Sequence, residues 1–238
     1  MMQPALVGSR DAALDLLKWL AMLSMFVDHL RFVWPELAWA FVPGRLAFPF
    51  FCLAVAANVR RGVLSWRYLA WLLMFALLSE WPYRLLVGNS TTLNILPTLA
   101  LGLLIAQGVA HDQARVRGLA LLALGVAWWG QQHLMFGFFG ALLPTACLLA
   151  LSRRGGWYLL AGMCAVLANY SPTLWAGARQ FQAFAWVSVM VCGVAPLLGL
   201  GLLRGGLKLR IWPLRRWGYL LYPGHLLIWA LVREQVAR

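Results

Sequence analysis

The sequence predicts an all-α protein, a polytopic membrane helix bundle of about 8–9 transmembrane helices with a cytoplasmic N-terminus. Of its 238 residues, 63% are hydrophobic and only 11% are charged. Several apolar segments approach the roughly 20 residues that a helix needs to cross a bilayer. Basic residues lie mostly in the short loops between these segments. No internal repeat or long linker interrupts this pattern, so residues 1–238 are expected to form a single integral membrane domain.

Nine apolar segments are expected to form the spans: 14–33, 46–59, 68–87, 95–110, 116–130, 134–151, 157–171, 181–203 and 216–233. Three of them, 46–59, 116–130 and 157–171, are short, so half-spans or re-entrant segments and a total of eight helices are the alternative. The four cysteines lie inside these segments without CxxC spacing (Cys52, Cys147, Cys164 and Cys192). This favours small buried apolar residues over a disulfide or metal role.

The positive charges predict the orientation, because loops rich in Lys and Arg stay in the cytoplasm. A cytoplasmic N-terminus keeps most of them inside: Arg10, Lys18, Arg60, Arg61, Arg67, Arg115, Arg117, Arg153, Arg154, Arg204, Lys208, Arg210, Arg215 and Arg216. The net charge of +13 therefore indicates contact with membrane lipids rather than with nucleic acid. The longest basic loop, 204–216, is interpreted as an anionic-lipid contact. The N-terminus lacks the pattern of a removable signal peptide, so the first helix is expected to be retained.

Charged groups stand at both ends of the first apolar segment. Asp15 and Lys18 lie at its inner end, whereas Asp28, His29 and Arg31 lie at its outer end. Ionisable groups in such a segment are costly and by default mark a functional site or a paired interior contact. Lys18 and His29 are about three helical turns apart, so they share one stripe of the helix, roughly 16 Å apart along its axis. The simpler alternative is that the outer group only ends the helix among lipid headgroups.

The same orientation collects further polar groups at the outer face: Pro43-Gly44-Arg45, Glu80-Trp81-Pro82-Tyr83-Arg84, the loop 89–94, Gln131-Gln132-His133, Asn169-Tyr170-Ser171 and Tyr222-Pro223-Gly224-His225. Pro82 is expected to kink or end its helix. Pro223 and Gly224 are expected to loosen the last helix and to bring His225 into a cavity.

An Asp beside a His suits general acid/base chemistry. Neighbouring helical residues point about 100° apart, however, so Asp28 could instead pair with Arg31, Arg45 or Arg84. His225 is a second candidate base, or else a packed, hydrogen-bonded histidine. A metal site would need a cluster of ligands, which His29, His133 and His225 with Asp28 or Glu80 could supply, but no HExxH-type spacing supports one, and none is expected. The sequence contains no nucleophile elbow, Walker loop or dinucleotide fingerprint, which favours direct acyl transfer assisted by a base over hydrolysis.

Three blocks of the sequence resemble the TraX family, whose members act on conjugative pilins. The first block is Asp15-x-x-Lys18 followed by Met25-x-x-Asp28-His29, the second is 44–51 (GRLAFPFF), and the third is 220–227 (LLYPGHLL). The first block is also distantly similar to the start of membrane acyltransferases that carry acyl groups from coenzyme A across the bilayer. The middle third matches the family little beyond Trp81-Pro82 and Asn94.

The resemblance implies a multi-pass enzyme of the bacterial inner membrane that acetylates the N-terminal amine of a processed conjugative pilin. It implies acetyl-CoA as co-substrate and catalytic roles for Asp28, His29, Arg45 and His225. Substrate-binding roles would fall to Asp15, Lys18, Arg31, Glu80, Arg84, Asn94 and Tyr222. Three alternatives stay open: a TrbP-like cyclase that joins pilin head to tail and needs no cofactor, a non-catalytic pilin chaperone, and a transporter with a proton path.

Overall fold

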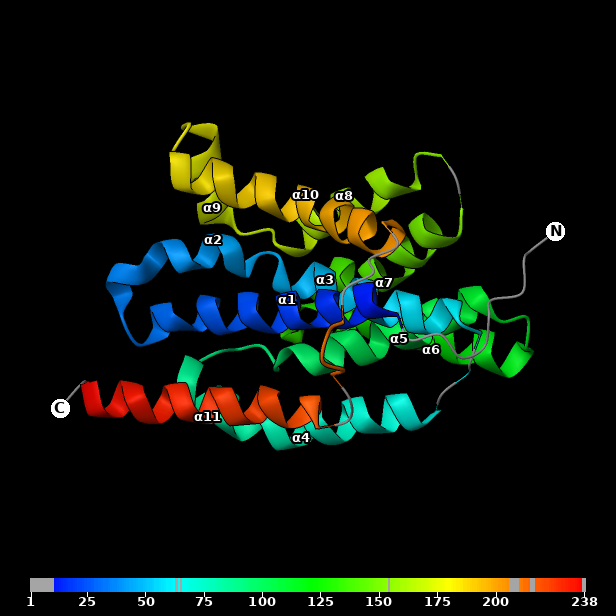
Figure 1. The fold of residues 1–238 in the computed structure, drawn as a ribbon, viewed down its shortest axis with the longest axis horizontal. Helices are drawn as coiled ribbons and strands as arrows, with labels where there is room; N and C mark the ends of the chain where they lie inside the picture. The colour runs from blue at the N-terminus through cyan, green and yellow to red at the C-terminus, as the bar shows by residue number, and fades with distance from the viewer. Residues whose placement is uncertain are drawn as a thin grey trace.

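The computed structural model describes residues 11–62, 64, 66–153, 155–205, 210–214 and 217–236, and its regular structure there is helical. The longer helices run roughly along the long axis of the bundle, with α4 and α11 side by side along one edge (Figure 1). The α-helices are α1 Ala12–His29, α2 Phe41–Gly44, α3 Ala47–Arg60, α4 Trp66–Val87, α5 Ile95–Ala110, α6 Ala114–Trp129, α7 Gly137–Ser152, α8 Trp157–Ala168, α9 Pro172–Arg179, α10 Ala183–Arg204 and α11 Gly218–Val236. Three short 3-10 helices are η1 Leu30–Phe32, η2 Pro35–Ala40 and η3 Gln131–His133.

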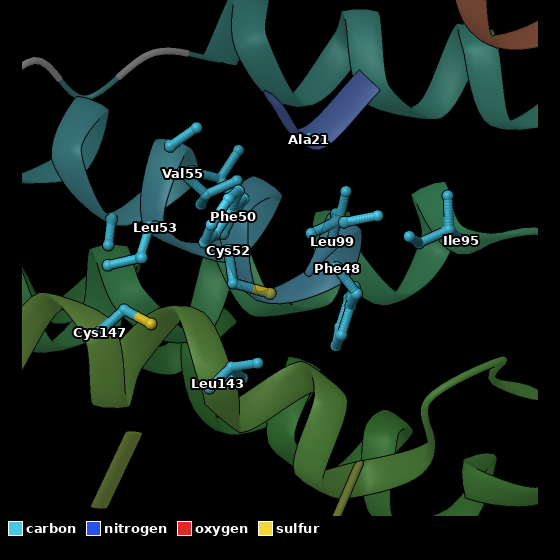
Figure 2. Close-up of a cluster of buried hydrophobic side chains, with 14 of the residues drawn as sticks. Ala21, Phe48, Phe50, Cys52, Leu53, Val55, Ile95, Leu99, Leu143 and Cys147 are labelled. Carbon is cyan, nitrogen blue, oxygen red and sulfur yellow. The ribbon is translucent and has the colours of Figure 1, made fainter. Parts of the chain in front are cut away.

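Helix α3 forms the centre of the bundle, because it contacts α1, α5, α7 and α10. Its side chains meet those of the surrounding helices in one apolar core (Figure 2). Within this core the Phe48 ring stacks on Phe136 at 3.8 Å between centroids. The four cysteines are free and buried, as predicted, and Figure 2 shows Cys52 and Cys147 among the core side chains. The outside of the bundle also carries large apolar side chains: Leu77, Leu121 and Trp129 are each at least 70% exposed.

All nine predicted segments lie largely in helices, and the segment 95–110 coincides with α5. Within the described residues, three helical segments are long and apolar enough to cross a membrane: Pro35–Arg60, Trp66–Val87 and Ala183–Arg204. The pair α8 and α9, bent by 110°, would make a fourth as a broken span or a re-entrant loop. The structure thus supports an apolar helical membrane protein, while the expected 8–9 spans and their orientation remain predictions.

Residues 34–45, which lie between two expected spans, form a run of short helical turns that leads into α3. Helix α4 does not end at Pro82 but continues to Val87, and α11 is likewise continuous through Pro223. A proline removes one backbone donor, and packing of α4 along α11 keeps both helices together across that missing bond. Arg10, Arg154, Lys208, Arg215 and Arg216 lie outside the described residues.

Candidate active site

Two histidines from opposite ends of the chain meet at the C-terminal end of α1. The Nδ1 atom of His29 lies 2.8 Å from Nε2 of His225, and the two rings are within 6° of parallel. His29 ends α1, and His225 lies in the middle of α11, where it is 2% exposed. The phenyl ring of Phe26 packs on His225 at 4.6 Å between centroids. His225 is therefore a packed, hydrogen-bonded histidine whose partner is the other candidate base, while its own role as a base stays a prediction.

The hydrogen bonds of this pair assign its protons. Nδ1 of His225 lies 2.8 Å from the carbonyl oxygen of Leu221, which can only accept, so this nitrogen carries the proton. In the neutral ring Nε2 of His225 is then an acceptor, and His29 must donate to it from Nδ1. This leaves the lone pair of His29 on Nε2. The pair thus holds His29 in the tautomer that can accept a proton from a substrate.

A carboxylate and two guanidiniums form a second cluster beside the histidines. Asp28 accepts from Nε and Nη2 of Arg31 at 3.1 and 3.4 Å, and Nη2 of Arg45 lies 3.6 Å from its Oδ1 atom. Arg84, the third partner considered for Asp28, pairs instead with Glu80 at 2.8 Å. Asp28 thus neutralises one of two positive charges and fixes both guanidiniums, and the partner that His29 takes is His225.

Arg45 is held on three sides. Its Nη1 donates to Oδ1 of Asn169 at 2.7 Å, its Nε donates to the carbonyl oxygen of Phe41 at 3.3 Å, and its guanidinium lies 3.8 Å from the centre of the Phe41 ring. Asn169 is itself fixed by donating from Nδ2 to the carbonyl oxygen of Ala165. Asn169 was not among the predicted site residues. Its only signal in the sequence was the polar break Asn169-Tyr170-Ser171 between two apolar segments.

Gly44 allows Asp28 to reach Arg45. A Cβ atom on Gly44 would lie 2.5 Å from both the Cβ and the Oδ1 of Asp28, which is far inside van der Waals contact. The neighbouring carbonyl of Pro43 accepts a hydrogen bond from the hydroxyl of Ser24, so α1 and α2 are joined closely at this point. The close approach explains why Gly precedes Arg45 in this segment. The same bond engages the hydroxyl of Ser24, which lies about one helical turn before Asp28.

These groups open into a cavity of about 260 Å³, the histidine cavity. Its wall contains Asp28, His29, Arg31 and Arg45 on one side. Its other lining residues are mostly apolar or aromatic: Met25, Phe32, Phe41, Gly44, Ala47, Phe48, Tyr83, Val87, Ile95, Met135, Phe136 and Tyr222. The mixture of one base, one ion-pair cluster and an apolar wall is suited to a small reacting group shielded from bulk water.

A second cavity of about 180 Å³, the lysine cavity, lies toward the other end of α1. Lys18 lines it together with mostly apolar residues of α1, α3, α4, α5 and α11, and its Nζ lies 3.7 Å from Oδ1 of Asp15. Ile95 and Tyr222 line both this cavity and the histidine cavity. The hydroxyl of Tyr222 lies 3.5 Å from the backbone nitrogen of Ile95. The two residues therefore form the partition between the Lys18 end and the His29 end.

Three predicted substrate-binding residues form a network of their own. Oε2 of Glu80 accepts from the backbone nitrogen and the side-chain amide of Asn94, at 3.0 and 2.7 Å. Asn94 is 1% exposed and caps α5 by accepting from the backbone nitrogen of Leu96. Arg84 bonds to Glu80 and to the carbonyl oxygen of Ser90. The network fixes the start of α5, whose first residue is Ile95 of the partition, and does not itself line the histidine cavity.

His133 lies in η3 near Gln132 and does not line the cavity of His29. Within the part of the chain that the structure describes, no three His, Cys, Asp or Glu side chains come together as metal ligands.

Comparison with known proteins gives one match. The model of the family described as TraX protein matches residues 13–233, nearly the whole chain. This chain belongs to the TraX family. No curated protein and no solved structure matches it. Membership indicates a membrane protein related to conjugation and associated with pilin.

The three blocks that resemble the TraX family converge in the structure. The first block supplies Lys18 and His29 from α1, the second supplies Gly44, Arg45 and the start of α3, and the third supplies His225 from α11. Residues of the first and second blocks line the histidine cavity, and Tyr222 of the third lines it as well. The stretches by which the chain resembles TraX proteins are therefore the ones that build this site.

Proposed function

We propose that this TraX protein transfers an acetyl group from acetyl-CoA to the N-terminal amine of a processed conjugative pilin, in the bacterial inner membrane. The observation that carries the proposal is the His29–His225 pair, which leaves a basic nitrogen at a cavity adjoining a second cavity that ends at Lys18. The family supports pilin as the partner. The described residues that line the histidine cavity include the base His29 but no serine or cysteine nucleophile, and this supports direct acyl transfer to the amine.

In this reaction the neutral pilin amine attacks the carbonyl carbon of the acetyl thioester. A carbon–nitrogen bond forms, the carbon–sulfur bond breaks, and CoA leaves as the thiolate. His29 takes the proton that the amine loses on Nε2 and passes it to the thiolate, which leaves as the free thiol. His225 accepts the Nδ1 proton of His29 in a hydrogen bond and thereby stabilises the imidazolium during the transfer.

Arg45 is suited to the negative charge that develops on the carbonyl oxygen. Its guanidinium is already fixed by Asn169, Phe41 and Asp28, so it does not have to reorganise when the charge appears. Asp28 keeps the two guanidiniums in place. In this proposal it therefore positions Arg31 and Arg45 and does not orient the base.

Acetyl-CoA is cytoplasmic, whereas a processed pilin has its new N-terminus at the outer face. In this proposal the two cavities together form the path by which the donor reaches the amine. With the N-terminus of this protein inside, Lys18 faces the cytoplasmic half and His29 faces the outer half. The donor thioester would extend from the lysine cavity past Tyr222 and Ile95 toward His29, a distance of roughly 16 Å along α1. Asp15 and Lys18 would lie where the donor enters.

Membrane vesicles of known orientation test both the reaction and the side from which the donor comes. Inverted inner-membrane vesicles that contain pilin and this protein should acetylate pilin when acetyl-CoA is added outside, because their cytoplasmic face is outward. Sealed right-side-out vesicles should not. Equal product in both would contradict the orientation, and absence of product in both would contradict acetyl transfer.

A further inference from the structure

A third and larger cavity, the vestibule, lies next to the histidine cavity and has no part in the mechanism above. Its volume is about 660 Å³, and it shares Arg31, Phe41, Arg45, Met135 and Phe136 with the histidine cavity. The two spaces are therefore neighbours, with the two guanidiniums in the wall that they share. The remaining lining residues are Pro35, Ala38, Ala168, Asn169, Tyr170, Ser171, Thr173, Leu174, Gln182, Phe184 and Ala185.

The vestibule owes its polar wall to the interruption between α8 and α9. These helices meet at 110°, and the break contributes Asn169, Tyr170 and Ser171. Thr173 adds a hydroxyl from α9 and Gln182 adds an amide from the N-cap position of α10, while Leu174 and Phe184 add apolar surface. Hydrogen-bonding groups interleaved with apolar ones match the alternating needs of an extended peptide: backbone groups to bond and side chains to bury.

The charges of the shared wall are unequal. Among the described residues that line the histidine cavity or the vestibule, Asp28 is the only acid, and it faces both Arg31 and Arg45. One positive charge is left over. The side chain of Arg31 is 28% exposed against 12% for Arg45, so Arg31 is the guanidinium of this cluster that an entering ligand can reach more easily. A guanidinium of this kind binds a carboxylate through paired hydrogen bonds.

We propose that the vestibule binds the first residues of the acceptor polypeptide in an extended conformation, with an acidic side chain near the free N-terminus paired to Arg31. The inference rests on the proposed function, since it takes the amine that enters the histidine cavity to belong to a polypeptide. It adds two points to that function: the acceptor should carry an acidic residue near its N-terminus, and the vestibule is the surface that recognises this residue. The same positive charge disfavours the ammonium form of the entering amine and so favours the neutral, nucleophilic form.

Peptide binding to the purified full-length protein in detergent, without any donor, tests this proposal. Two fluorescent peptides with free N-termini and amidated C-termini differ only in Glu or Gln near the N-terminus. The wild type should bind the Glu peptide about tenfold more tightly. Arg31→Gln should remove this preference, and Thr173→Trp, which fills the vestibule, should weaken both peptides by about tenfold or more. Arg117→Gln, the same change on the exposed start of α6, should bind both as the wild type does.

Several results would overturn the proposal: equal affinity of the wild type for both peptides, a preference that survives Arg31→Gln, or unchanged binding by Thr173→Trp. A peptide with a free C-terminal carboxylate and no acidic side chain that binds best would assign the vestibule to a chain end instead. If no peptide binds and phosphatidylglycerol stabilises the wild type but not Arg31→Gln, the vestibule takes a lipid headgroup. Because no donor is present, these outcomes are independent of whether acetyl transfer itself occurs.

Discussion

The Nδ1 atom of His29 and the Nε2 atom of His225, 196 residues apart in the chain, are joined at 2.8 Å. This contact connects α1 to α11 and sets the tautomer of both rings, since the carbonyl of Leu221 fixes the proton at the far end. A base at the surface of a cavity is backed by a second imidazole that can share its charge. In the proposed reaction the two histidines therefore have distinct roles: His29 would take the proton of the amine, and His225 would hold His29 in the required tautomer.

The two histidines should differ in what their removal costs. His29→Gln is expected to reduce acetylated pilin by about 10²- to 10⁴-fold, because the base is lost. His225→Phe keeps a ring against Phe26 but leaves the His29 Nδ1 proton without its acceptor. It should cost less, about ten- to a hundredfold, through loss of the fixed tautomer. Pilin mass spectra at equal protein level measure both. A larger loss for His225→Phe at unchanged thermal stability would reverse the two assignments.

Arg45→Lys should preserve expression and membrane insertion but lower the product about ten- to a hundredfold. A lysine keeps the positive charge, but its single ammonium group cannot contact Asn169, Phe41 and Asp28 simultaneously, as the planar guanidinium of Arg45 does. Immunoblots of membranes together with pilin mass spectra measure the two quantities. Arg117→Lys is the matched control and should have no effect on either. Near-normal product from Arg45→Lys would remove Arg45 from the site.

Gly44→Ala should lower the thermal stability and the activity together. The added methyl group would collide with the carboxylate of Asp28, and overpacking of this kind costs about 1–3 kcal/mol. Gly118→Ala on α6 is the control, because its Cβ would meet nothing within 4 Å, and alanine is the better helix former. Melting curves of the purified variants in detergent measure the thermal stability of Gly44→Ala and of Gly118→Ala. A neutral Gly44→Ala variant would contradict the close approach of α1 and α2.

Asn94→Ala should act through stability. It removes the cap of α5 and the side-chain amide that donates to Oε2 of Glu80, while the backbone nitrogen of residue 94 keeps its bond, so we expect a loss of about 1–2 kcal/mol. Gln113 occupies the same cap position on α6 without a side-chain cap bond, and Gln113→Ala should be neutral. Thermal unfolding measures both variants. If Asn94→Ala is fully stable but no longer binds acetyl-CoA, the substrate-binding role expected from the sequence would be supported instead.

Hydrophobic segments were the part of the fold that the sequence predicted well, because burial in lipid or core leaves long apolar runs such as 95–110. The turns at 34–45 and α9 were missed, since short helices carry little periodicity. The sequence singled out Asp28, His29, Arg45 and His225 as candidates because ionisable groups are rare in such segments. Their partners were not: Asn169 is 124 residues from Arg45, and only the packing of both α8 and α2 against α10 brings the two together. The grouping of Glu80 and Asn94 around the start of α5, away from the base, likewise depends on tertiary packing.

The intact mass of pilin tests the central claim most directly. Pilin should be compared from cells with the wild-type protein, with His29→Gln and without the protein. Acetyl transfer predicts a gain of one acetyl group in the first sample alone, located on the N-terminal residue. Loss of one water in the wild-type sample would contradict it in favour of head-to-tail joining. An unchanged pilin mass in all three samples would contradict every enzymatic reading of this site.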